Sequence, residues 1–121
     1  DMCGAIAAGR FANERVVTAS LDHVDFISPI DLGEIAVLEA YVFDTGRTSM
    51  DVWVEVHAEN PRVDEKRRTT SSFLTFVAID DGGEPTPVPE LVCEEQAAGE
   101  LRDHARERRR EQLERLTEQL D

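Results

Sequence analysis

The sequence predicts an α+β fold in which an antiparallel β-sheet wraps around a central α-helix, with an additional C-terminal helix. Three observations predict it: a small apolar segment opens the chain, four β-rich segments separated by turn residues follow, and a long charged helical pattern comes last. A chain of 121 residues is long enough for one domain core and too short for two. We therefore expect a domain at residues 1–92 and an arginine-rich helix at residues 93–121.

The opening segment, residues 1–12, is small and apolar almost all round, with Gly4 and Gly9 among alanines. A helix without a polar face is typically buried and contacts other parts of the protein on all sides. Small side chains let a neighbouring backbone come close to it. We therefore predict a buried central helix. Because Asp1 opens directly onto this apolar run, we also expect that the sequence as given begins inside a structural element and that a segment before it is missing.

The β-rich segments occupy residues 16–26, 34–44, 48–59 and 68–80. Alternation is clearest in the third, where Val52 and Val54 face one way and Trp53 and His57 the other. The breaks between segments are short and rich in turn residues, which favours antiparallel neighbours. Three prolines between residues 85 and 89 then predict an extended segment that ends the sheet.

The last segment, residues 94–120, follows a helical pattern. Its predicted apolar stripe comprises Leu101, Ala105, Leu113, Leu116 and Leu120. Arg102, Arg106 and Arg110 run along one side of the same helix. A row of guanidinium groups suits a polyphosphate ligand, whereas pairing with the interspersed glutamates would make only a solvated helix face. Both interpretations stay open at this point.

The charge balance excludes some function classes. The formal net charge of −13 speaks against a nucleic-acid groove, and the longest charge-free stretch, residues 69–79, is too short to span a membrane. Lys66 is the one lysine among 13 basic residues, and an acidic, lysine-poor surface is typical of halophilic proteins; an ordinary acidic protein is the alternative. Cys3 and Cys93 fit reduced thiols in a cytoplasmic protein and no disulfide framework or zinc site.

A few residues are candidates for chemistry. Asp1 would stand beside the unpaired N–H groups at the start of the first helix, a place that suits a reacting oxyanion, although composition and periodicity alone favour a simple N-cap. His23 and Asp25 share one face of a strand, but two ligands do not make a metal site, so we expect no metal. His57 and His104 are more simply explained as residues of solvated or interfacial faces.

The motifs taken together resemble the hotdog-fold acyl-CoA thioesterases, over residues 1–92 and more loosely over the last helix. The order and spacing of the segments carry the resemblance, since each motif alone is weak. The matching segments are Asp1-Met2-Cys3-Gly4-Ala5-Ile6-Ala7-Ala8, Val16-Val17-Thr18-Ala19-Ser20-Leu21-Asp22, Asp25-Phe26, Ser28-Pro29, Gly33-Glu34, Gly46-Arg47-Thr48-Ser49-Met50 and Phe73-Leu74-Thr75-Phe76-Val77-Ala78.

The resemblance implies a curved sheet around a central helix, with active sites at the interface of a homodimer and further assembly into trimers of dimers. It assigns the catalytic role, as general base or nucleophile on the thioester carbonyl, to Asp1. Cofactors other than the coenzyme A of the substrate are not expected. The residues that would bind coenzyme A are Ala19, Ser20 and Leu21, Thr48, Ser49 and Met50, and Arg110 on the last helix.

Two functions from different classes follow from this resemblance. The first is an acyl-CoA hydrolase of fatty acid metabolism that releases a free carboxylic acid and coenzyme A without a metal. The alternative is a hotdog module that binds coenzyme A thioesters and does not cleave them. Release of a free thiol from acyl-CoA discriminates between them.

The charge balance generates a prediction about salt. The Debye length shrinks from ~30 Å at 0.01 M salt to ~3 Å at 1 M, so that salt screens the repulsion among carboxylates. We expect the melting temperature, measured by thermal melts, to rise up to molar salt. We also expect the oligomer, measured by sedimentation, to dissociate less as the salt concentration rises. Melting temperatures that stay flat or fall over this range would contradict a halophilic origin.

Overall fold

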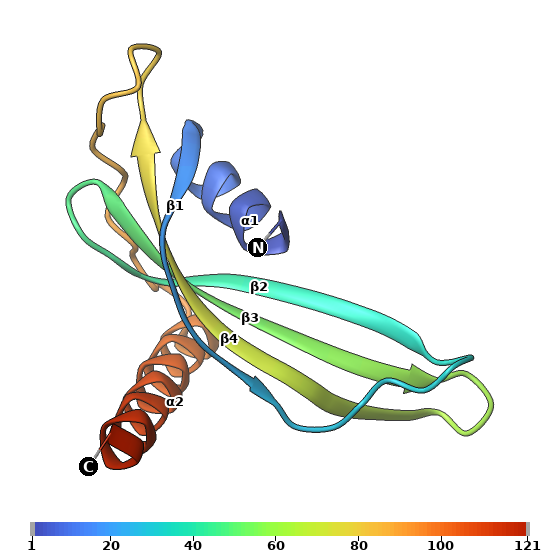
Figure 1. Cartoon of the computed structure of the whole chain (residues 1–121). Helices are drawn as coiled ribbons and strands as arrows, with labels where there is room; N and C mark the ends of the chain where they lie inside the picture. Colours follow the sequence, from blue (N-terminus) through green and yellow to red (C-terminus); the bar gives the residue numbers. More distant parts are fainter. Residues whose placement is uncertain (1, 121) are drawn as a thin grey trace.

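The structure is a computed structural model, and it describes residues 2–120 (Figure 1). The elements follow the predicted order: α1 (Met2–Ala12), β1 (Arg15–Phe26), β2 (Ile35–Thr45), β3 (Ser49–Asn60), β4 (Glu65–Ile79) and α2 (Gln96–Leu120). The largest difference from the predicted bounds is at β4, which begins at residue 65 instead of 68. The α+β class and the antiparallel sheet with its C-terminal helix are confirmed.

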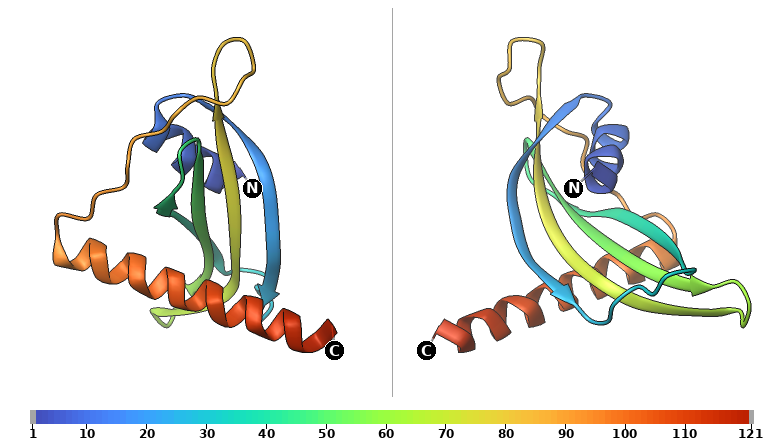
Figure 2. Two further views of the ribbon diagram at one scale, coloured as in Figure 1. Left: turned by 90° about the vertical axis from the view of Figure 1, so that its left-hand side faces the viewer. Right: turned by 45° about the vertical axis from the view of Figure 1, so that its right-hand side comes forward.

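The four strands form one sheet in the order β1-β4-β3-β2, and every neighbouring pair is antiparallel. The two sequence neighbours β1 and β2 therefore lie at opposite edges, and the connection at residues 27–34 runs across the far end of the sheet, past β4 and β3 (Figure 1). The strands are long and bend together, so one face of the sheet is concave. Helix α1 lies on the concave face and α2 on the other (Figure 2).

The core between α1 and the sheet is aliphatic except for Phe76 and the partly buried Phe11. Ala8 of α1 meets Met50, Leu74 and Phe76, which are all at most 1% exposed. Gly4 sets the distance: a Cβ atom there would lie 3.1 Å from Phe76 Cε2 and 3.4 Å from Val54 Cγ2. The prediction that small residues allow a close approach is confirmed at this position.

Protein does not surround α1 on all sides, in contrast to our prediction. Met2 is 79% exposed and Ile6 50% exposed, while Ala8 and Ala12 on the opposite side are buried. The physical reason is that α1 rests on one face of a single sheet, and nothing within residues 2–120 covers its other side. The apolar side chains on the exposed side of α1 therefore do not contribute to the core that residues 2–120 form.

The second core lies between the sheet and α2, and it is aromatic. Trp53 stacks on Phe73 with ring centroids 6.0 Å apart, Phe43 meets Phe73 edge-on, and Ala105 of α2 completes the cluster. Trp53 Nε1 donates a buried hydrogen bond of 2.9 Å to Ser71 Oγ. Because Trp53 lies on this side and the flanking valines on the other, the predicted alternation in β3 is confirmed.

Two leucines of the apolar stripe predicted for α2 do not form its buried side. Ala105 is fully buried, but Leu101 and Leu113 are 37% and 45% exposed, and Gln112 is buried instead. The cause is electrostatic, because α2 is turned so that Arg109 Nη1 reaches Asp51 Oδ2 of β3 at 3.1 Å. The side chains of Leu116 and Leu120 lie outside those that the structure describes.

The segment between β4 and α2 is extended, as its prolines predict. It makes one isolated bridge, between Ile79 and Pro85, and Val88 N donates a 2.9 Å hydrogen bond to Arg47 O. Val88 also packs against the aliphatic core. This segment therefore carries the chain from one end of the sheet to the start of α2 on the opposite face.

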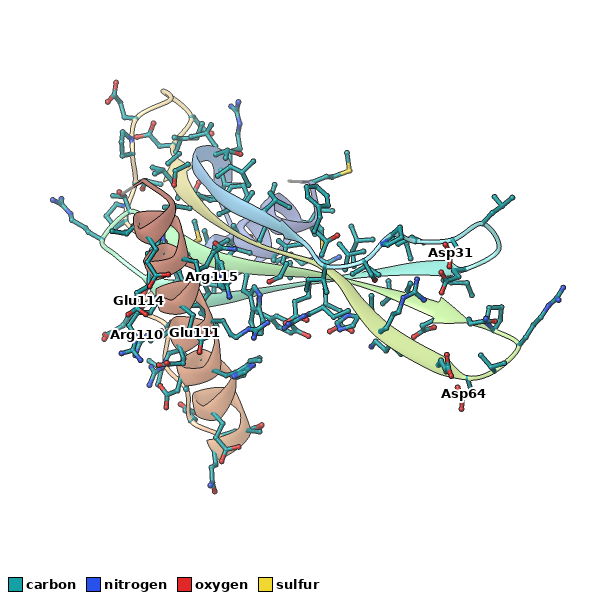
Figure 3. All side chains as sticks on the ribbon, turned by 60° about the horizontal axis from the view of Figure 1, so that its bottom comes forward. Asp31, Asp64, Arg110, Glu111, Glu114 and Arg115 are labelled. Atoms are coloured by element: carbon teal, nitrogen blue, oxygen red, sulfur yellow. The ribbon has the colours of Figure 1, made fainter. Side chains whose placement is uncertain are left out.

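An arginine holds the β1–β2 connection at the far end of the sheet, where Asp31 and Asp64 are labelled in Figure 3. Arg67 Nη2 of β4 donates to Glu34 Oε1 at 2.8 Å and to Pro29 O at 2.7 Å. Glu34 Oε1 also accepts a 2.8 Å hydrogen bond from Asp31 N. The carboxylate is thus bound from two directions.

This arrangement generates a prediction about acid. The hydrogen bonds from Arg67 and the Asp31 N–H lower the pKa of Glu34 from 4.5 to about 2. A depressed pKa contributes stability that is present above the unfolded value and is lost as the pH falls from about 4.5 toward 2. We expect urea unfolding at about pH 5 and pH 2.5 to show a larger loss for the parent than for Arg67→Met. Arg62→Met, on the neighbouring exposed loop, is the control; equal losses in all three proteins would contradict this role.

Candidate functional site

The start of α1 is the centre of the candidate site, because the predicted catalytic residue, Asp1, immediately precedes it. Asp1 itself lies outside the described residues. Helix α1 runs from the middle of the concave face toward the start of β1 (Figures 1 and 2). Contact of Gly4 with Phe76 and Val54 holds its first turn against the central strands. The N–H groups of a first turn have no partner within the helix and form a positive end that favours a negatively charged group.

Exposed apolar side chains share the concave side of the sheet with α1. Leu21 of β1 is 59% exposed and lies opposite Leu74, and Leu38 of β2 is 53% exposed and lies opposite Val56. Directly opposed residues of antiparallel strands point to the same face, so both leucines belong to the side that α1 covers in part. Together with Ile6 they provide apolar surface of the kind that takes an acyl chain or a second subunit.

The first predicted coenzyme A segment, Ala19 to Leu21, lies on β1, which is an edge strand of the described sheet. All three residues are exposed. The pairing with β4 shifts between Thr18 and Ser20, so Ala19 has no opposite residue there. An edge strand presents backbone N–H and C=O groups that can pair with the amides of an extended ligand.

The second predicted segment, Thr48 to Met50, leads into β3. Gly46 makes the tight turn before it, since a Cβ there would lie 2.6 Å from Ser49 Oγ. Thr48 and Ser49 are partly exposed, and Thr48 O accepts a 3.0 Å hydrogen bond from Ala78 N. Met50 is fully buried in the aliphatic core, so its side chain supports the segment and does not present a surface to a ligand.

The two segments lie at the same level of the sheet, on either side of β4. Thr18 and Met50 are both opposite Phe76, and Ser20 and Asp51 are both opposite Thr75. Two strand spacings separate them, about 10 Å. The structure thus brings the segments near one another across β4 but does not join them into one surface.

The arginine row of α2 divides into residues with different surroundings. Arg106 binds Asp44 of β2 through Nε at 3.1 Å and Nη2 at 2.9 Å, and these hydrogen bonds lower the pKa of Asp44. Arg110 is 66% exposed and pairs with Glu107 one turn earlier, which raises the pKa of its guanidinium. Figure 3 shows Arg110 and Glu114 projecting from the same side of α2. Arg110 can therefore meet a ligand from solvent, whereas Arg106 holds α2 to the sheet.

The histidines do not assemble a metal site within the described residues, where no three His, Cys, Asp or Glu side chains lie together. His57 Nε2 is 3.4 Å from Glu55 Oε2 on the side of the sheet that α2 covers. His104 is exposed, as predicted, and one side of its ring packs edge-on against Trp53 with ring centroids 5.5 Å apart. The side chains of His23 and Asp25 lie outside those that the structure describes.

Sequence reasoning missed one feature, a cavity of about 190 Å³ between β2 and the start of α2. Phe43, Cys93 and Arg102 are among its lining residues. No sequence signal could have found it, because Phe43 is far along the chain from Cys93 and Arg102. Its opening depends on how α2 sits on the sheet.

Comparison with known proteins matches residues 1–65 to the model of the Thioesterase superfamily. The uncharacterized acyl-CoA thioester hydrolase YkhA of Bacillus subtilis is 40% identical over 115 residues, which is 95% of this chain and 67% of that protein. An apo-hexameric acyl-CoA thioesterase has a TM-score of 0.79 at 42% identity, over 93% of this chain and 72% of its own. An acyl-CoA hydrolase from Staphylococcus aureus, solved with butyryl coenzyme A and coenzyme A, has a TM-score of 0.73 at 35% identity, over 97% and 75%.

Proposed function

The chain belongs to the Thioesterase superfamily, and we propose that it hydrolyses acyl-CoA to a free carboxylic acid and coenzyme A. The observation that carries this proposal is the similarity to proteins named acyl-CoA thioester hydrolases over 95% of the chain, at a TM-score of 0.79 for a solved acyl-CoA thioesterase. A helix start at the middle of a concave, partly apolar face supports it, because a thioester needs a polar group at its carbonyl and apolar surface along its acyl chain.

We assign the reacting carboxylate to Asp1. As a general base, it takes a proton from water, the hydroxide attacks the thioester carbonyl carbon, the carbon–sulfur bond breaks, and the thiolate leaves and is protonated as coenzyme A. As a nucleophile, the carboxylate attacks the same carbon, the carbon–sulfur bond breaks and the thiolate leaves as coenzyme A; water then hydrolyses the acyl anhydride to the free acid and restores the carboxylate. In either route the N–H groups at the start of α1 favour the negative charge that develops on the carbonyl oxygen.

Coenzyme A would lie along the outer edge of β1. The exposed backbone at Ala19 to Leu21 can pair with the amides of its pantetheine arm, and the partly exposed Thr48 and Ser49 lie at the same level beyond β4. Met50 keeps the second segment in place from within the core. Arg110 would meet a phosphate of the nucleotide, exchanging its contact with Glu107 for a charge-assisted one.

Self-association into a homodimer, and further into a trimer of dimers, is part of this proposal. The exposed Met2 and Ile6 on the open side of α1 need cover that residues 2–120 do not supply. Two similar solved proteins are described as a hexameric acyl-CoA thioesterase and a hexameric thioesterase from Yersinia pestis. A dimer would place the β1 edge of one subunit beside its partner and complete the site from both sides.

The cellular location and the kinds of partner are part of the same proposal. Neither described helix is long and apolar enough to cross a bilayer. The net charge of −13 speaks against nucleic acid as a partner. We propose a cytoplasmic acyl-CoA hydrolase of fatty acid metabolism, from an organism that accumulates salt.

The role of Arg110 can be tested with two substrates. Arg110→Glu replaces attraction to a nucleotide phosphate with repulsion and should raise KM for acyl-CoA by about tenfold or more. An acyl pantetheine, which has no nucleotide, should show an almost unchanged KM. Arg115→Glu, on the same helix, is the matched control. Equal losses for both substrates would mean that Arg110 acts on the helix and not on the nucleotide.

The role of Asp1 decides between a hydrolase and a binding module. Asp1→Asn keeps the size and most of the capping capacity of the side chain but removes its charge, so the fold should survive. In the full-length protein, we expect free-thiol release to fall by about 10² or more, while binding of the coenzyme A ester persists. A variant that hydrolyses acyl-CoA as fast as its parent would show that Asp1 is only a cap. A parent that binds the ester without releasing thiol would favour the binding module.

A further inference from the structure

A small cavity opens on the α2 side of the sheet, between the end of β2, residues 91–93 and the first turns of α2. Its volume is about 190 Å³, below the range of about 300–1,000 Å³ typical of sites for drug-sized ligands. Phe43, Leu91 and Leu101 make its walls mainly apolar. A ligand that fills it must therefore be small and largely aliphatic.

Arg102 brings a charge into this apolar lining. Its Nε atom is buried and has no hydrogen-bond acceptor among the described residues. The carboxylate nearest to Nε is Asp103 Oδ1, at 3.9 Å and mostly in solvent, which is too far for a hydrogen bond. Asp44, whose pKa the charge of Arg102 also lowers, is already bound by Arg106. A buried donor left without an acceptor costs free energy, which a bound acceptor would recover.

We propose that this cavity binds a short-chain aliphatic carboxylate, with its carboxylate on Arg102 and its chain against Phe43, Leu91 and Leu101. One guanidinium matches one carboxylate in charge and geometry, and apolar walls disfavour a more highly charged phosphate ligand. The binding chemistry follows from the cavity alone. The source of the ligand rests on the proposed function, since hydrolysis of an acyl-CoA releases a carboxylic acid; the site would then sense the product on the face of the sheet opposite α1.

Two cysteines make the inference testable without measuring activity. Cys93 lines the cavity and packs beside Gly99, whereas Cys3 is on α1 at the other face of the sheet. A ligand in the cavity must therefore shield Cys93 from a thiol reagent. Cys3, beside the proposed catalytic Asp1, reports separately on a carboxylate bound at the start of α1.

The experiment uses the full protein with butyrate as the probe. Alkylation by iodoacetamide is followed at each cysteine by mass spectrometry of its peptide. At a butyrate concentration ten times the Kd of the cavity, alkylation of Cys93 should slow by about tenfold. Butyramide has the same size and no charge, and should not protect. Arg102→Gln should abolish protection, while Arg108→Gln, on the same helix and outside the cavity lining, should keep it.

Several results would overturn the inference. They are equal protection by butyramide, protection that persists in Arg102→Gln, or alkylation of Cys93 that butyrate does not change. Equilibrium dialysis with radiolabelled butyrate gives a second readout should Cys93 react too slowly, and parent protein that retains no butyrate would also overturn it. Because neither readout depends on turnover, failure here leaves the proposed hydrolase standing, and an inactive enzyme that still shields Cys93 leaves this site standing.

Discussion

The fold depends on the two central strands, β3 and β4, whose side chains alternate between two covered faces. Val52 and Val54 enter the aliphatic core under α1, and Trp53 enters the aromatic core under α2. A slip of one residue would exchange the two sets and put the indole against Gly4, where the helix is already in contact with the sheet. The register of these strands therefore determines both where the helices lie and which chemistry each one meets.

The two helices pack on the two faces of the sheet through different kinds of side chain. Helix α1 uses small residues, so its first turn can lie close to the central strands while its outer side stays open. Helix α2 is strongly polar and buries Ala105 within a frame of ion pairs, from Arg106 to Asp44 and from Arg109 to Asp51. The proposed chemistry belongs to the start of α1 on the concave face. The cavity lies on the other face, beside α2, where Arg102 Nε has no acceptor among the described residues.

Local patterns predicted the elements well and the burial of single residues less well. The alternation of apolar and polar side chains in β3 and the small residues of α1 are features of residues close together in the sequence. They could therefore be recognised without a structure. The buried side of α2 could not, because leucines at helical spacing compete with arginines for the same face, and the aspartates that decide the competition lie on other strands. The same limit applies to Met50, whose neighbours Thr48 and Ser49 are partly exposed while its own side chain is in the core.

The sequence by itself determined the class of fold, the order of the elements, the acidic surface and the ordered set of motifs that marks the family. Hydrophobic period and turn chemistry act over a few residues, and family motifs are strings of neighbours. Only the tertiary structure decided that Ser20 and Asp51 flank the same residue of β4, that Arg106 is bound while Arg110 is exposed, and that Arg102 faces an apolar cavity. Each of these depends on contacts between residues distant in the chain, and such contacts exist only after the sheet has bent and both helices have settled on its two faces.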